Sequence, residues 1–201
     1  MPTPVEWLNE VKANSGSAAT GVPSRPQIIA LSNGNVPVAW EEDAAGTVAP
    51  GDGADIVCVF FAADGTVVRA PFRLNGHRSL DNENNFSIAD TNDGGFVMAY
   101  VDTDSIFPNL SDLVFERYDS LGNQTAFDVL ALENQASQTI TLPSVAVNLD
   151  DNSFMVSYNF ELPGGDDDIL ARIVSGTNVV GPETMRRRTR LTMTSIRRPR
   201  S

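Results

Sequence analysis

The fold of this chain is decided by three related stretches: "IIALSNGNVPVAWEED" (residues 28–43), "SIADTNDGGFVMAYVDTD" (87–104) and "VAVNLDDNSFMVSYNFE" (145–161). Each stretch begins with apolar residues, passes through a turn rich in Asn, Asp and Gly, and continues as an alternating strand that leads to an aromatic residue. The aromatic residues are Trp40, Tyr100 and Tyr158, which are 60 and 58 positions apart. Spacing this regular indicates copies of one structural repeat.

A second block of sequence follows each stretch at a similar distance. The three blocks are "ADIVCVFFAADGT" (54–66), "SDLVFERYDSLGN" (111–123) and "DDILARIVSGTN" (167–178). Their aspartates Asp55, Asp112 and Asp168 are 57 and 56 positions apart. The whole unit therefore repeats, with a period of about 58 residues.

Each unit reads as four β-strands joined by tight turns. In the first unit the predicted strands are residues 27–32, 36–42, 54–62 and 67–74. Asn33-Gly34 and Asp64-Gly65 separate alternating runs and predict hairpins, whose favoured turn needs positive φ at both central residues. No part of the repeats has sustained helical periodicity.

Four strands per repeat are typical of a β-propeller blade. We therefore predict an all-β fold, a β-propeller-like array of four-stranded antiparallel blades in an incomplete ring. The predicted divisions are residues 1–14 (fourth strand of a leading blade), 26–75, 86–134 and 143–183 (three repeats), and 184–201 (tail). Blades bury their apolar faces against neighbours, so the outer faces of the array should stay exposed and favour self-association.

Composition limits the partners of the chain. Its 201 residues include 14 basic and 26 acidic ones, a net charge of −12. An acidic surface repels nucleic acids and anionic lipids, so we expect neither as a partner. The sequence has no N-terminal signal and no apolar run long enough to span a bilayer. Cys58, the single cysteine, lies in an apolar run, which predicts a buried structural thiol.

The last residues differ from the rest. "ETMRRRTRLTMTSIRRPRS" (183–201) holds seven of the fourteen basic residues and one acid. We interpret residues 184–201 as an aberrant, disordered tail produced by a frameshift in the gene. A genuine basic tail is the alternative, and an arm for nucleic acid or membrane is a third interpretation, although it would lack interleaved aromatic residues.

The best-formed unit contains "PQIIALSNG" (26–34), "DIVCVFFAADGT" (55–66) and "FRLN" (72–75). This pattern resembles the propeller-like repeats of large secreted bacterial proteins of the RTX and hemolysin-type calcium-binding group, over roughly residues 5–183. The resemblance implies a secreted, extracellular or cell-surface location and calcium-assisted folding. The chain departs from that group in having no tandem glycine- and aspartate-rich nonapeptide.

Acidic residues near the third strands are candidate calcium ligands, because hard cations need several oxygen ligands. The candidates are Asp102, Asp104 and Asp112 in the second repeat, and Asp166, Asp167 and Asp168 in the third. The alternative is that these acids only keep the rim of the array soluble. "DTNDGG" (90–95) lacks the spacing of an EF-hand, so we predict none there.

Catalytic signals are weak. Paired acids, Glu41 with Glu42 and Asp102 with Asp104, could serve as the two carboxyl groups of a glycosidase, but we expect them at the rim. The aromatic series Trp40, Tyr100 and Tyr158 could stack on sugar rings, although packing between blades is the favoured interpretation. His77, the only histidine, lies in a polar linker, and we expect it to be solvated.

We therefore predict a non-catalytic structural, adhesion or binding module of a secreted bacterial repeat protein, with calcium as its one candidate cofactor. The expected partners are a cell-surface or matrix component, or neighbouring repeats of a larger protein. The alternative is a carbohydrate-binding or glycoside-hydrolysing β-propeller.

Overall fold

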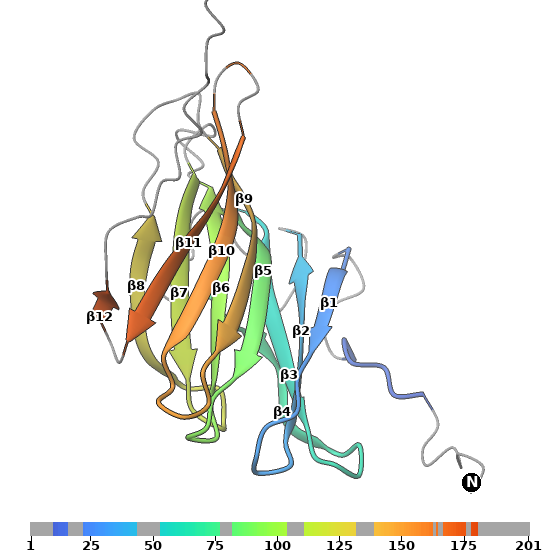
Figure 1. The fold of residues 1–201 in the computed structure, drawn as a ribbon. Helices are drawn as coiled ribbons and strands as arrows, with labels where there is room; N and C mark the ends of the chain where they lie inside the picture. The colour runs from blue at the N-terminus through green and yellow to red at the C-terminus, as the bar shows by residue number, and fades with distance from the viewer. Residues whose placement is uncertain are drawn as a thin grey trace, which may run out of the picture.

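The computed structural model describes residues 10–15, 22–43, 53–76, 82–103, 111–131, 139–162, 164, 167–175 and 178–180. Across these ranges the chain forms three antiparallel sheets, each of four strands (Figure 1). The described residues contain no helix, and hence no apolar helix of membrane-spanning length. The prediction of an all-β array of four-stranded blades is confirmed.

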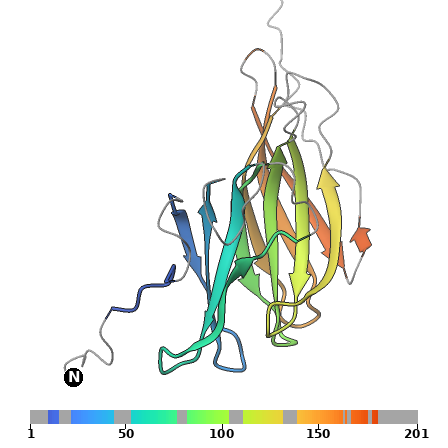
Figure 2. The same ribbon diagram turned by 180° about the vertical axis from the view of Figure 1, so that it is seen from behind.

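Strands pair in the order in which they occur, so each sheet is a simple meander. The first sheet contains β1 (Ser24–Ile28), β2 (Val36–Glu42), β3 (Asp55–Phe61) and β4 (Val67–Arg73). The second contains β5 (Asn82–Asp90), β6 (Phe96–Thr103), β7 (Ser111–Tyr118) and β8 (Gln124–Ala131). The third contains β9 (Thr139–Val147), β10 (Phe154–Glu161), β11 (Asp168–Ser175) and β12 (Asn178–Val180). Figure 2 shows the same three blades from behind.

The turns that contain Gly34, Gly65, Gly94 and Gly122 share one geometry that differs from the predicted one, whereas the turn between β9 and β10 is longer and places Asn152 at a φ of 57°. In the first, the Leu31 N–H donates to the Asn35 carbonyl at 2.9 Å and the Gly34 N–H donates to the Leu31 carbonyl at 2.9 Å. Positive φ occurs at Gly34 (85°) but not at Asn33. These are three-residue loops with glycine in the left-handed position, so glycine alone bears the unusual backbone.

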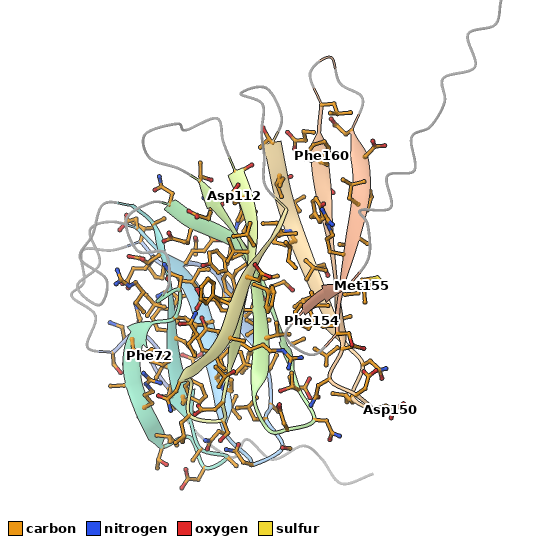
Figure 3. The ribbon with its side chains drawn as sticks, turned by 90° about the vertical axis from the view of Figure 1, so that its left-hand side faces the viewer. Phe72, Asp112, Asp150, Phe154, Met155 and Phe160 are labelled. Atoms are coloured by element: carbon orange, nitrogen blue, oxygen red, sulfur yellow. The ribbon has the colours of Figure 1, made fainter. Side chains whose placement is uncertain are left out.

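Apolar cores fill the spaces between sheets. One core joins the first and second sheets and includes Phe60, Phe96 and Tyr100. Another joins the second and third sheets and includes Phe115, Phe154 and Tyr158. Figure 3 shows side chains crowded between the ribbons and labels Phe154 and Phe160 of the second core. The second sheet serves both cores because successive side chains of a strand point to opposite faces.

The first strand of the repeat begins earlier than predicted. It covers Ser24–Ile28 rather than residues 27–32, because the pairing of β1 with β2 starts at Ser24 and passes through an irregularity before Gln27. Of the predicted leading strand at residues 1–14, residues 10–14 contain a turn and no strand, and the rest lies outside the described residues, as does the basic tail.

Candidate functional site

The innermost strands of the array are β1, β5 and β9, the first strand of each sheet. β5 lies beside both β1 and β9 (Figures 1 and 2). Gln27 on β1 joins that strand to β5, since the Ile88 N–H donates to the Gln27 Oε1 at 3.2 Å. Ser87 on β5 joins that strand to β9 in the same way, because the Val145 N–H donates to the Ser87 Oγ at 3.2 Å. The blades thus converge through repeated side-chain hydrogen bonds.

Each inner strand is interrupted at the same place in the repeat. Arg25, Asn85 and Leu142 all have a φ of 50°, a left-handed conformation that is rare for residues other than glycine. The pairing of each strand with its neighbour shifts register beside these residues. Bulges and strained backbone gather at functional sites because they redirect side chains. The three bulges therefore mark this end of the inner strands as a candidate site.

Glu41, at the end of β2, connects the bulges of the first two blades. Its Oε1 accepts a hydrogen bond of 2.6 Å from the Asn85 N–H, and the Ser24 hydroxyl donates to its Oε2 at 3.4 Å. Arg25 lies 3.7 Å from the Glu41 carboxylate and also donates to the Asn85 side chain. We call Ser24, Arg25, Glu41 and Asn85 the bulge site. It combines a carboxylate, a guanidinium, an amide and a hydroxyl.

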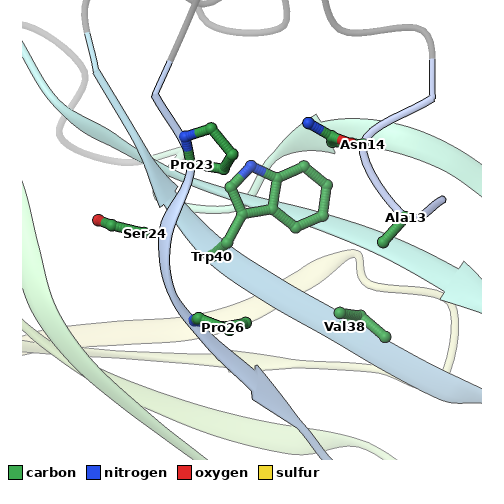
Figure 4. Close-up of a pocket in the computed structure, with 7 residues that line it drawn as sticks. All are labelled: Ala13, Asn14, Pro23, Ser24, Pro26, Val38 and Trp40. Atoms are coloured by element: carbon green, nitrogen blue, oxygen red, sulfur yellow. The ribbon is translucent and has the colours of Figure 1, made fainter.

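A pocket of about 260 Å³ adjoins the bulge site and shares Ser24 with it. Its lining is Ala13, Asn14, Pro23, Ser24, Pro26, Val38 and Trp40 (Figure 4). The indole Nε1 of Trp40 is buried and has no hydrogen-bond partner among the described residues. This Trp40 pocket thus has a mostly apolar lining and meets the bulge site only at Ser24, because Trp40 and Glu41 are consecutive residues of β2 and point to opposite faces of the first sheet.

Behind the bulge site lies a buried acid network. The side-chain nitrogen of Asn75 donates to Asp55 at 2.9 Å and to Glu83 at 2.7 Å, which joins β3 to β5. Burial raises the pKa of Asp55, and the Asn75 hydrogen bond and the charge of Arg73 offset part of that rise. Asp55 and Glu83 are 3% and 0% exposed, so a substrate has no access to them.

The candidate calcium ligands are only partly brought together. Asp102 on β6 is the direct cross-strand neighbour of Asp112 on β7. Asp167 directly precedes β11 in the third sheet and Asp168 begins it, while Asp104 and Asp166 lie outside the described residues. Within the described ranges, no three acidic, histidine or cysteine side chains are grouped so that they could hold a metal ion.

Two expectations about the acids and aromatic residues need correction. Glu42 and Asp102 are each 2% exposed and belong to strands, so they do not form a solvated rim. Pairing of β6 with β7 continues past Asp102 to Thr103, and Glu42 is itself paired with Asp55 at the end of β2. Tyr100 and Tyr158 pack between blades as predicted, whereas Trp40 lines a pocket. Cys58 is buried, which confirms its structural role, and His77 lies outside the described residues.

Sequence reasoning singled out Glu41 and Trp40 but missed Ser24, Arg25 and Asn85. No sequence signal marked these positions, although Arg25 and Leu142 each precede a proline at equivalent places in the repeat. A residue before proline normally avoids the helical region, and nothing in the sequence indicates a left-handed conformation there.

The geometry defines a β-propeller-type fold with a polar site at the converging ends of its inner strands. No family model matches the chain, and no curated protein matches it either. Two solved structures share its fold with a TM-score of 0.52 each: a thermostable family-43 glycoside hydrolase (12% identity) and an endo-arabinase from Bacteroides thetaiotaomicron VPI-5482 (11% identity). Each alignment covers 79% of this chain, which spans 57% of the first and 58% of the second.

This finding contradicts the prediction that the chain is not an enzyme, because both of these solved structures are named as enzymes that act on glycans. The similarity to these two structures does not test the RTX resemblance, the secreted location or the binding of calcium. These three stay predictions.

Proposed function

We propose that the chain is a carbohydrate-active β-propeller module of the glycoside-hydrolase type, in which the bulge site and the Trp40 pocket together recognise a sugar chain. The observation that carries the proposal is the position of Glu41, held by Asn85 and by Ser24, a residue that also lines the Trp40 pocket. Sugar rings have apolar faces and hydroxyl edges. The apolar lining of the pocket complements the faces, and the carboxylate, guanidinium and amide of the bulge site complement the hydroxyl edges.

Glu41 is also the candidate for chemistry. Glycosidic bonds are cleaved by a pair of carboxyl groups that flank the bond. Of the buried acids at this end of the blades, Glu41 has the largest exposed fraction, 9%, against 2% for Asp102 and 0% for Glu83. Glu41 is therefore the candidate for one carboxyl group of such a pair. The second would have to come from outside the described residues, because the other acids at this end of the blades are more deeply buried and hold the strands in place.

The test begins with binding. The full chain is titrated calorimetrically with arabinan, chosen because a structure with this fold is an endo-arabinase, and with other plant and bacterial polysaccharides. Glu41→Gln keeps the shape of the side chain but removes its charge, and we expect weaker binding. Glu161→Gln, an exposed acid of the third sheet, is the matched control and should bind as the unchanged chain does.

Release of reducing ends from the polysaccharide that binds best then tests cleavage. We expect Glu41→Gln to abolish any turnover and Glu161→Gln to retain it. If the chain binds no polysaccharide, or if Glu41→Gln binds and turns over as well as the control, the assignment of this site is wrong.

A further inference from the structure

The third sheet carries exposed apolar side chains on the face that points away from the second sheet. Met155 on β10 lies directly opposite Ile173 on β11, and Ile169 lies four positions before Ile173 on the same face of β11. Their exposed fractions are 45%, 47% and 71%. The adjacent Phe154, labelled with Met155 in Figure 3, is 2% exposed and belongs to the core on the other side. We call Met155, Ser157, Ile169, Ala171 and Ile173 the open face.

Equivalent positions in the other two blades are interface residues. Ile56, Leu113 and Ile169 occupy the same place in the repeat, because each lies opposite the residue that follows Trp40, Tyr100 or Tyr158. Ile56 and Leu113 are 0% exposed, since the next sheet covers them. The open face therefore continues a sheet-to-sheet interface that occurs twice already within the molecule. An exposed face of this composition marks an interaction surface.

The opposite end of the array is covered at its centre. On the outward face of the first sheet, Trp40, Val57, Val59 and Phe61 are at most 8% exposed, whereas Ile28 and Val67, which lie opposite Val38 and Phe61 on that face, are 66% and 51% exposed. Addition of copies head to tail, with the third sheet of one against the first sheet of the next, would need the centre of that face to be uncovered. Contact between two open faces uncovers no buried residue. Such an arrangement is twofold symmetric and closes after two copies.

The open face is suited to meet itself. Ser157 and Ala171 lie directly opposite each other at its centre, and their small side chains allow two backbones to approach closely. With antiparallel strands and a twofold axis near this pair, Ile169 of each copy meets Met155 and Ile173 of the other. The five residues of the open face carry no charge. Acids flank it, Asp167, Asp168 and Glu161 at one end and the turn with Asp150 and Asp151 at the other.

We propose that two copies of this chain associate through the open face, around a twofold axis close to Ser157 and Ala171. The flanking acids of the two copies approach each other in this arrangement. Salt screens their repulsion and strengthens the apolar contact, so the dimer becomes tighter as ionic strength rises. A dimer held together by ion pairs would instead become weaker as ionic strength rises.

Sedimentation velocity of the full chain over a wide concentration range, at low and high salt, tests this proposal. We expect a monomer–dimer equilibrium that shifts towards the dimer in high salt. Ile169→Lys places two charges in the apolar contact and should weaken the dimer at least about tenfold. The control is Val67→Lys on β4, where an equally apolar residue is 51% exposed outside the open face, and it should dimerise normally.

A cross-link locates the axis. Cys58 is buried, so Ser157→Cys introduces the reactive thiol, and a short bismaleimide should couple two copies. Thr66→Cys, in a turn of the first sheet, should stay uncoupled. A monomer at every concentration, an assembly larger than a dimer, or equal weakening by Val67→Lys and Ile169→Lys would each overturn the proposal.

Discussion

The second and third sheets follow one sequence pattern and have different surroundings. β6 and β10 are equivalent strands, yet seven of the eight residues of β6 are buried, whereas β10 alternates between buried residues and more exposed ones. The second sheet supplies side chains to two cores and the third to one. The sequence of a repeat thus specifies a four-stranded sheet. The neighbouring sheets determine whether one or both faces of that sheet are buried. In such arrays stability accumulates by nearest-neighbour contacts, so the outermost unit is the weakest.

The largest test of this contrast is a pair of equivalent substitutions. Leu113→Ala removes a fully buried side chain from the second sheet, and we expect a loss of about 3 kcal/mol in the free energy of unfolding. Ile169→Ala, at the same position of the third sheet but 71% exposed, should change it by less than about 0.5 kcal/mol in the monomer. Urea unfolding at low protein concentration measures both. Similar losses for the two variants would show that the third sheet is as well covered as the second.

The next test compares the interface between the first and second sheets with the interface between the second and third. Asn75→Ala deprives Asp55 and Glu83 of a shared donor and the Ile56 N–H of its acceptor, so we expect a loss of about 2–3 kcal/mol. In the second interface Ser111 accepts a hydrogen bond of 2.8 Å from the Ile140 N–H, and Ser111→Ala should cost about 1 kcal/mol. Thermal unfolding of both variants shows which substitution costs more stability. The reverse order would mean that the acid network does not hold the first interface.

A third test uses the repeated turns. Gly122 has a φ of 80°, and a side chain there would lie 2.8 Å from Phe72 and 2.9 Å from Phe60. Gly122→Ala should cost about 2 kcal/mol, since backbone strain and crowding add. Gly34 has a φ of 85° but open space around it, so Gly34→Ala should cost only about 1 kcal/mol. Equal costs in thermal unfolding would show that the turn after β7 does not press against the first sheet.

The smallest effect is expected at high pH. Burial, and next the charge of Glu116, raise the pKa values of Tyr100 and Tyr118 in the folded chain. Both hydroxyls hydrogen-bond to Glu116, at 2.8 and 2.6 Å. A raised folded pKa contributes stability that is complete below the unfolded value near 10 and is lost as pH rises further.

Tyr118→Phe should therefore reduce the alkaline loss of stability by about 1.4 kcal/mol for each pH unit above 10. Urea titrations at a series of pH values measure this slope. An unchanged slope would mean that Tyr118 is not held neutral in the interface between the first two sheets.

Several features of the fold were predictable because they depend on local order. The strand at residues 36–42 was predicted where β2 is found, since alternation and a flanking Asn-Gly turn specify a hairpin strand. The start of the repeat was misjudged, because β1 contains a bulge at Arg25 that interrupts alternation. The left-handed conformations of Arg25 and Leu142, each before a proline, have no sequence signature.

The candidate site was less predictable than the fold. Glu41 and Trp40 were weighed from the sequence, yet the partner of Glu41 is the backbone of Asn85, 44 positions away. Asp102 and Glu42 were expected at a solvated rim, and each is instead 2% exposed within a paired strand. Such contacts depend on how the blades stack, and the alternation of residues along one strand does not predict that stacking.

By itself, the sequence determined the repeat, its four-stranded sheets and their turns, because alternation, glycine and hydrogen-bonding side chains act within a few residues. Only the tertiary structure decided which faces are covered, which acids are buried and which polar side chains meet at the inner strands. Those outcomes depend on contacts between sheets about sixty positions apart, and the free energy of such contacts resides in the packed array rather than in any one repeat.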